Sequence, residues 1–465
     1  FNFAKNKAFV DITAHQGNDF QISGEFWKQL DSLCSKFDKK GSFVAIPGYE
    51  WSGNTSLGGD RNVFFPNEGR TIRRSSHALL SDHSDIETDC TTTNDLFNAL
   101  EAGKEFDTLM YAHCGGRYAD IKLAHDGRFE KSVEVHSSWG SFEWIVNDAF
   151  ECGYRVGIVG NSDGHKGRPG ASYPGSSMFG AIGGLTCFLV PELSRENILD
   201  CIRKRRHYAT SGGPTGRMHI DLKANFTEPA NVFHDDPKLF KPKSMESKQA
   251  LMGDIVHLPN GEAEIDLIIN AAAPIERIDI FNGLKHLETF RPYEESELGN
   301  RIRVIWEGAE YRGRFRQVIW DGNANITQNT IVSSNAINFF NKDKELKLLS
   351  KTSLEWKALT TGNIGGFDFW LKDSKKGKLK INTPLIQAEI PIEEIGLKDI
   401  IFDKSSVLPR YLKVFRMPSE GKYNKISIKR KININNSGDN PIFIRLIQED
   451  GTIAWTSPIY IFREM

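Results

Sequence analysis

Short apolar runs alternate with amphipathic helical stretches over the first 215 residues. Phe26, Leu30, Leu33 and Phe37 recur at the spacing of one helix face, which predicts a helix there. The same pattern predicts helices over 94–103, 142–152 and 194–206, the last with Ser194 as its N-cap. Apolar runs between them predict strands. These runs are Ala8–Thr13, Phe43–Ile46, Thr108–Ala112, Ser132–Val135 and Val156–Val159. A β-α-β-α order of this kind is typical of a parallel sheet or barrel.

The pattern changes after Pro214. Runs with a period of two residues, such as Glu264–Ile269 and Arg301–Trp306, are separated by turn signals such as Asp321-Gly322. A polar stretch at about 222–250 reads as a loop or insertion. We therefore predict two domains, 1–215 and 216–465, the second β-rich and resembling a mainly antiparallel β-sandwich.

Composition narrows the possible classes of protein. The chain has 465 residues, 39% of them hydrophobic and 26% charged, which excludes a mainly disordered protein. The net charge is −1, and no apolar run approaches the roughly 20 residues of a membrane helix. Neither nucleic acid nor a membrane is therefore indicated as a partner. We expect a small-molecule or phosphorylated substrate.

The cysteines and the first residue bear on the compartment. All six cysteines lie in the first half and none forms a CxxC pair, so buried free thiols are expected rather than a thiolate zinc site. This favours a reducing compartment such as the cytoplasm. Residue 1 is Phe, so we expect that an N-terminal piece, with or without a signal segment, is missing.

Metal-binding side chains stand at the ends of successive predicted strands. The carboxyl ends of the strands of a βα barrel form the face on which active sites are built, so these side chains should converge. Imidazole and carboxylate ligands suit Zn, Mn or Fe, and a bridging carboxylate suits a cluster of two or three ions. The residues concerned are His15, Glu50, His113, Glu134, His136, Asp163 and His165.

The order His15, Glu50, His113 and Ser162-Asp163-Gly164-His165 resembles the PHP superfamily, named for polymerase and histidinol phosphatase. Further runs are similar to a large branch of it with a β-rich C-terminal domain. They are Gly48-Tyr49-Glu50-Trp51, Gly58-Gly59-Asp60-Arg61-Asn62, Val133-Glu134-Val135-His136 and the segment 450–459. The resemblance implies a distorted, TIM-like βα barrel of seven strands over 1–215. It also implies up to three divalent ions (Zn, Mn or Fe) and phosphoesterase chemistry.

Carried over residue by residue, the resemblance implies a set of site residues. Catalysis would rest on Glu50, His136 and Asp163, with Glu50 bridging two metals and either His136 or a metal-bound water protonating the leaving oxygen. Glu134 would orient a ligand from outside the cluster. Arg61, Arg117 and Arg168 are candidates for holding an anionic substrate, or else ordinary solvated arginines. The implied metal ligands are His15, Glu50, His77, His113, Asp163 and His165.

The chain departs from the family pattern at the first strand. Ala14 stands where the family has Asp, and Cys114 stands where proline is frequent. The family's opening His-x-His motif is absent before His15, and we expect it on an N-terminal strand that this chain lacks.

These observations predict a metal-dependent hydrolase, a phosphoesterase that uses a metal-bridging hydroxide. Two alternatives remain open. The same cluster suits an amide or other ester hydrolase, and the β-rich half could instead be a binding module on a degenerate, non-catalytic barrel.

Overall fold

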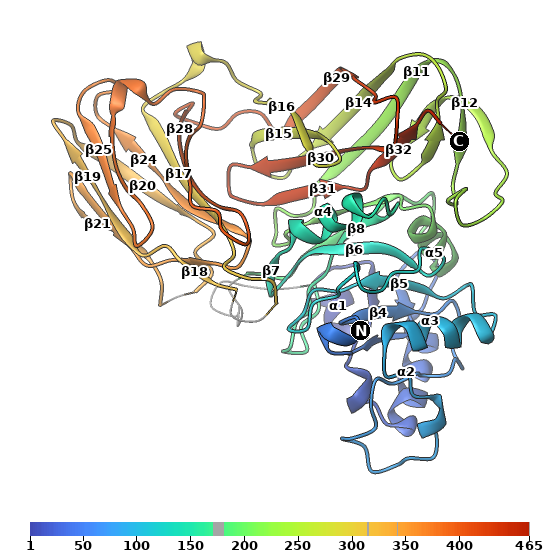
Figure 1. The fold of residues 1–465 in the computed structure, drawn as a ribbon. Coiled ribbons are helices and arrows are strands. Elements are labelled where there is room, and N and C mark those ends of the chain that lie inside the picture. The colour runs from blue at the N-terminus through green and yellow to red at the C-terminus, as the bar shows by residue number, and fades with distance from the viewer. Residues whose placement is uncertain (171–180, 314–315, 342, 465) are drawn as a thin grey trace.

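The computed structural model describes residues 1–170, 181–313, 316–341 and 343–464. The α-helices of the described residues all lie in the first part (Figure 1), and the helix predictions are confirmed to within a few residues. Ser23 caps α2, and Ser194 caps α5 as predicted. The helices are α1 (Asn2–Asn6), α2 (Gly24–Phe37), α3 (Thr93–Ala102), α4 (Glu143–Glu151) and α5 (Arg195–Arg203). No helix among the described residues is long and apolar enough to cross a membrane.

The first part contains a mixed sheet rather than a parallel one. Its strands β3 and β4 are antiparallel, as are β4 and β5, whereas β5, β6 and β8 run parallel. The short β7 adds an antiparallel pairing to the end of β6, and β1 pairs with β2 in parallel. The bounds are β1 (Ile12–Ala14), β2 (Val44–Ile46), β3 (Gly48–Trp51), β4 (Arg61–Phe64), β5 (Leu109–Ala112), β6 (Glu130–Ser137), β7 (Gly140–Ser141) and β8 (Gly157–Gly160).

The predicted distorted seven-stranded βα barrel is therefore wrong. A parallel crossover needs a dozen or more residues, usually a helix, between strands. Only Pro47 separates β2 from β3, and the chain returns from β3 into an antiparallel β4 without a helical crossover. Glu50 and His136 lie within β3 and β6 of this mixed sheet, whereas His15 follows β1, which belongs to a separate two-stranded sheet.

A large, mainly antiparallel sheet takes strands from both halves of the chain, so the architecture is also not a barrel followed by a sandwich. Strands β9 and β10 pair with each other, and β10 also pairs with β31 near the C-terminus. The strands are β9 (Leu185–Phe188), β10 (His207–Thr210), β11 (His219–Phe233), β12 (Met245–Leu251), β13 (Ile255–His257), β14 (Ala263–Asn270), β15 (Ile275–Asn282), β16 (Lys285–Phe290), β29 (Lys425–Ile432), β30 (Asn440–Gln448), β31 (Ile453–Thr456) and β32 (Ile459–Phe462).

The loop or insertion predicted at about 222–250 is also wrong, since β11 and β12 occupy most of it. Ile220, Leu222, Ala224 and Phe226 alternate into the core, between polar residues that face outward. The polar face of this alternation gave the stretch its loop-like composition.

A β-sandwich is present, but only over 301–417. Its two sheets pack face to face around Trp306, Trp356 and Phe367, which are almost fully buried. One sheet has β17 (Arg301–Gly308), β20 (Ile331–Ile337), β24 (Ile364–Leu371), β27 (Ile400–Asp403) and β28 (Arg410–Met417). The other has β19 (Gly322–Thr327), β21 (Leu346–Ser350), β22 (Ser353–Trp356), β25 (Lys378–Asn382) and β26 (Gln387–Pro391), and β18 (Val318–Ile319) pairs with β23 (Leu359–Thr360).

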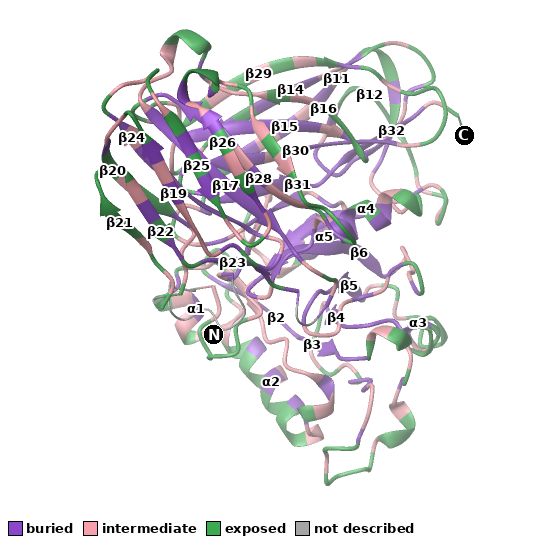
Figure 2. Ribbon diagram, turned by 60° about the vertical axis from the view of Figure 1, so that its left-hand side comes forward, coloured by how far each residue is buried: buried purple, intermediate pink, exposed green. Residues whose placement is uncertain are grey.

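The first part, the large sheet and the sandwich share buried surfaces. One apolar cluster joins Val133 and Ile145 of the first part to Trp455 of the large sheet and Phe415 of the sandwich. Strands β6 and β17 are buried along their whole length (Figure 2). The domain boundary at residue 215 remains a prediction, and the structure shows a continuous core on both sides of it.

A network of buried charges lies where the sandwich meets the large sheet. Arg303 of β17 donates to both carboxylate oxygens of Asp368 on β24, at 2.7 and 2.8 Å. It also donates to Glu276 Oε2 on β15 and to the carbonyl of Glu449, which follows β30. Arg301 bridges Asp368 and Glu449 in the same way. The charges are thus paired and hydrogen-bonded, as burial requires.

We predict that Arg303→Met lowers the free energy of unfolding by about 3–5 kcal/mol, because it leaves buried carboxylates without their partner. Urea unfolding measures the loss. The matched control is Lys347→Met, which removes an exposed ion pair with Glu345 and should cost less than about 1 kcal/mol. An equal decrease in the free energy of unfolding in the two variants would show that the buried network stabilises the fold no more than an exposed ion pair does.

The same network predicts a pH dependence of stability. Burial alone raises the pKa of Glu276, but the charges of Arg277 and Arg303 lower it to about 2, below the ordinary value of 4.5. A carboxylate whose pKa is depressed on folding stabilises the protein above its unfolded pKa. We therefore expect stability to fall as the pH drops from about 4.5 towards 2, and Glu276→Gln to reduce that slope. Unfolding curves at several pH values measure the free energy of unfolding of the wild type and of Glu276→Gln. The same pH dependence in both proteins would contradict the role given to Glu276.

Candidate functional site

The topology of the first sheet brings several strand ends to one edge. Because β3 and β5 are both antiparallel to β4, they run in the same direction, and β6 and β8 run parallel to β5. The carboxyl ends of β3, β5, β6 and β8 therefore share an edge with the amino end of β4. Side chains that are far apart in the sequence meet at this edge.

Glu50, His113 and Asp163 form a cluster at this edge. Each offers one ligand atom, and these atoms all lie within 4.8 Å of one another. His113 Nε2 lies 3.4 Å from Asp163 Oδ2 and 3.9 Å from Glu50 Oε2. Glu50 and His113 are buried, and Asp163 is partly buried.

Glu134 orients the ring of His113 from the side opposite Glu50 and Asp163. Its Nδ1 lies 2.9 Å from Glu134 Oε1, and Glu134 Oε2 accepts a hydrogen bond from Asn161 Nδ2 at 2.8 Å. With a proton on Nδ1 shared with this carboxylate, Nε2 is the nitrogen that faces Glu50 and Asp163. A carboxylate behind a histidine in this way is the usual support of a metal ligand. The sequence-based role for Glu134 thus has a matching geometry.

Glu50 and Asp163 each present one carboxylate oxygen to the cluster. Glu50 Oε1 accepts hydrogen bonds from Asn18 Nδ2 and Ser52 Oγ, both at 2.9 Å, so Oε2 is the oxygen that faces His113. Asp163 Oδ2 is buried and has no hydrogen-bond partner among the described residues. Asp163 also has a φ of 41°, a left-handed conformation that is uncommon outside glycine and collects at functional sites.

The electrostatics of the cluster are unbalanced towards negative charge. Burial raises the pKa of Glu50 to about 8, and the charges of Asp60 and Asp163 add to the effect. Burial likewise raises the pKa of Asp60 to about 6. Burial alone lowers the pKa of His113, but Glu134 and Asp163 raise it well above its usual value. A dication beside these carboxylates would relieve the repulsion between them.

The donor set fits a divalent metal ion. Two carboxylates and an imidazole suit Zn, Mn or Fe. Ligands about 2.1 Å from a tetrahedral ion lie about 3.4 Å apart, close to the separations found here. A cation here would also satisfy Asp163 Oδ2.

The other predicted ligands lie outside this group of atoms. The half-buried His15 packs edge-on against Phe26, and its Nδ1 accepts from the backbone N–H of Gly17. His77 contacts Asp85 through Nε2 and Asp89 through Nδ1. These contacts account for both histidines without a shared metal.

His165 and His136 differ in their surroundings. His165 is half-exposed and adjoins the cluster, with Nδ1 3.8 Å from Asp163 Oδ1. His136 is buried between Ser141 Oγ and the carbonyl of Ile182, and burial lowers its pKa to about 4. A neutral ring with both nitrogens engaged is poorly suited to the proton-donor role assigned from the sequence.

The predicted substrate-binding arginines are dispersed. Arg117 lies at the cluster, where its Nε donates to Asp60 Oδ1 at 2.9 Å and its guanidinium is 3.7 Å from Glu50. Arg61 is fully buried and paired with Glu130, which makes it a structural residue. Arg168 is exposed.

Sequence reasoning missed Asp60 and Arg316. Asp60 directly precedes β4, and it was overlooked because only carboxyl ends of parallel strands were considered, whereas β4 brings its amino end to the site. The run Gly58-Gly59-Asp60-Arg61-Asn62 was noticed, but for its arginine. Arg316 comes from the second half, and its Nη2 donates to the carbonyl of Gly115 at 2.7 Å.

Comparisons with known proteins give little beyond the structure. No family model matches the chain, and no solved structure matches it. An uncharacterized protein of Chlamydia pneumoniae is 21% identical over 220 residues, which cover 42% of this chain and 33% of that protein. The chain thus spans about a third of the length of the relative it matches, and that relative's description names no activity.

Proposed function

We propose that the protein is a metal-dependent hydrolase of phosphate esters, with Glu50, His113 and Asp163 as the core of its metal site. The observation that carries the proposal is the buried Oδ2 of Asp163, which faces His113 and Glu50 and lacks a hydrogen-bond partner among the described residues. Other buried atoms among the described residues also lack hydrogen bonds, but this one lies within 4.8 Å of ligand atoms of Glu50 and His113, where an ion would complete its coordination. The resemblance to the PHP superfamily is part of this proposal and adds the phosphoester.

A divalent ion held by Glu50, His113 and Asp163 would supply a bound water of lowered pKa and a positive charge next to the phosphoryl oxygens. The chain holds the ligands still: Glu134 fixes the His113 ring, and Asn18 with Ser52 fixes Glu50. Arg117 balances Asp60 and adds positive charge near the site. His165, beside Asp163, is the candidate for a fourth ligand.

Hydrolysis of an amide or another ester is compatible with the same ligands. A panel of phosphomonoesters, phosphodiesters, carboxylic esters and amides, assayed with Mn²⁺ and with Zn²⁺, decides between them. A purified protein that binds no metal would overturn the proposal and favour a non-catalytic binding protein.

Glu50→Gln tests the metal site most directly. It keeps the shape of the side chain but removes its negative charge, so we predict a lower metal content and a loss of hydrolysis of at least about 100-fold. Metal analysis and phosphoester assays, side by side with the wild type, measure both. Glu101→Gln, which alters an exposed pair with Arg128, is the control and should change neither. If Glu50→Gln has the metal content and activity of the wild type, Glu50 is not a metal ligand.

Gly115 offers a steric test of the same site. A Cβ at this position would lie 3.0 Å from His113 Nε2 and 3.2 Å from Asp60 Oδ2, closer than side chains normally approach. We predict that Gly115→Ala weakens Mn²⁺ binding by about 10-fold or more, as changes around metal ligands do, and leaves the fold intact. Calorimetric titration measures the affinity. Gly24→Ala, where a Cβ meets nothing within 4 Å, is the matched control. Unchanged affinity in Gly115→Ala would place the metal elsewhere.

A further inference from the structure

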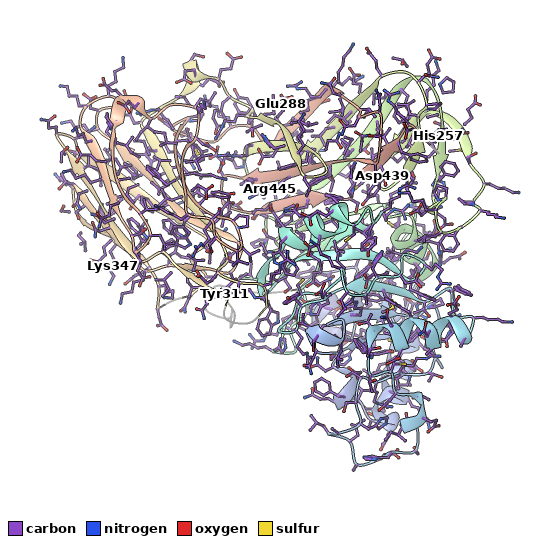
Figure 3. All side chains as sticks on the ribbon, viewed as in Figure 1. His257, Glu288, Tyr311, Lys347, Asp439 and Arg445 are labelled. Carbon is purple, nitrogen blue, oxygen red and sulfur yellow. The ribbon has the colours of Figure 1, made fainter. Side chains whose placement is uncertain are left out.

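A segment of the second half lies directly against the candidate site. Residues 308–313 and 316–317 lead from β17 towards β18, and Figure 3 labels Tyr311 where the sandwich approaches the first part. The backbone N–H of Glu310 donates to the carbonyl of Arg316 at 2.7 Å, which closes the segment on itself. Arg312 makes a bidentate pair with Asp148 of α4, at 2.7 and 3.0 Å. Gly313 lies against the ring of Tyr118.

Arg316 is the residue of this segment that reaches the site. It is only 4% exposed, and its guanidinium lies 4.9 Å from the ring centre of Phe142 and 5.8 Å from that of Trp139. Its Nη2 donates to the carbonyl of Gly115, whose Cα faces His113 Nε2 and Asp60 Oδ2. The ring of Trp139 in turn contacts that of His165. Arg316 is thus separated from His113 of the candidate cluster by one residue, Gly115, and Trp139 connects it to the neighbouring His165.

The hydrogen bonding of Arg316 is incomplete. Its Nη1 is buried and has no partner among the described residues. Other buried arginines have fuller sets of partners. Carboxylates bind Arg61 and Arg303, and three backbone carbonyls bind Arg205. A buried guanidinium nitrogen without any acceptor is costly, so Nη1 of Arg316 is a candidate for binding a ligand.

Two buried atoms of opposite charge that lack hydrogen bonds among the described residues thus belong to residues close to His113. Asp163 lies against His113, and Arg316 binds the carbonyl of Gly115, two positions further along the chain. Asp163 Oδ2 calls for a cation and Arg316 Nη1 calls for an anion. Burial lowers the pKa of Arg316 to about 10, and the charges of Cys114, Asp163 and Glu134 only partly oppose this effect. A divalent ion together with a phosphoryl group bound to it would satisfy both atoms, whereas either one alone would leave the other unpaired.

We propose that Arg316 binds the anionic oxygens of the substrate's phosphoryl group, so that the second half of the chain completes the site formed by the first. This rests on the proposed function, which it extends by naming a substrate-binding residue. The planar guanidinium is the side chain best suited to phosphate, and its stacking between rings fixes its direction. Gly115 anchors it through Nη2 and leaves Nη1 for the ligand.

The test measures binding of inorganic phosphate by calorimetry, with and without saturating Mn²⁺. Arg316→Gln removes the charge, and Arg312→Gln removes a neighbouring arginine that pairs with Asp148 instead. We expect Arg316→Gln to bind Mn²⁺ at the wild-type stoichiometry but to bind phosphate at least about 10-fold more weakly. Arg312→Gln should match the wild type in both.

The possible outcomes separate this inference from the proposed function. Wild-type phosphate affinity in a folded, Mn²⁺-loaded Arg316→Gln would overturn the role of Arg316 and leave the metal site standing. If the wild type binds no Mn²⁺, the proposed function fails. In that case the role of Arg316 in phosphate binding is supported only if Arg316→Gln still weakens phosphate binding measured without metal. Equal phosphate binding by the wild type and the variant would overturn it.

A crystal structure of the wild type with Mn²⁺ and phosphate tests the inference without a variant, in case Arg316→Gln does not fold. We expect a phosphate oxygen within hydrogen-bond distance of Arg316 Nη1. Phosphate bound elsewhere, with Nη1 directed at protein atoms, would overturn the proposal.

Discussion

The buried ion network around Arg303 is the interaction on which the arrangement of the molecule depends most. It ties β17 and β24 of the sandwich to β15 and the end of β30 in the large sheet. The network fixes the geometry of this junction more than it adds to stability. The attraction within a buried ion pair does little more than offset the cost of desolvating its charges, but removing one partner is strongly destabilising. Because β17 leads directly into the segment that carries Arg316, the network also fixes where that segment meets the first part.

The candidate site depends on a second constraint, the direction of the strands. Two antiparallel pairings in succession, β3 with β4 and β4 with β5, return β3 to the direction of β5. Glu50 and His113 therefore lie at the same edge although no helical crossover links their strands. The same reversal brings Asp60 to that edge from the start of β4, which an all-parallel barrel would have placed at the opposite end.

Local pattern predicted much of the structure, and long-range pairing accounts for most of what it missed. The spacing of Phe26, Leu30, Leu33 and Phe37 predicted a helix correctly, because the apolar face of a helix can be recognised within one short stretch of sequence. Strand ends likewise pointed to Glu50, His113 and Asp163. The barrel failed because strand direction depends on partners, and β10 takes its partner, β31, from almost 250 residues away. Arg316 left no comparable signal, since its neighbours at the site come from another part of the chain.

The contrast between the two buried polar regions bears on function. Around Arg303 the charged groups find partners within the protein, as expected of groups that serve only to join elements. At the edge of the first sheet, Asp163 Oδ2 and Arg316 Nη1 are also buried, but neither has a hydrogen bond among the described residues, although Asp163 Oδ2 lies 3.4 Å from His113 Nε2. Both regions lie in the same well-packed molecule, so loose packing does not explain the difference. Buried atoms without hydrogen bonds also occur elsewhere among the described residues, for example Arg74 Nη2 and Glu105 Oε2, but close to His113 a carboxylate and a guanidinium each leave one atom in this state. Where groups of both signs of charge are left incomplete beside the same side chain, a ligand rather than the protein is expected to complete the hydrogen bonding.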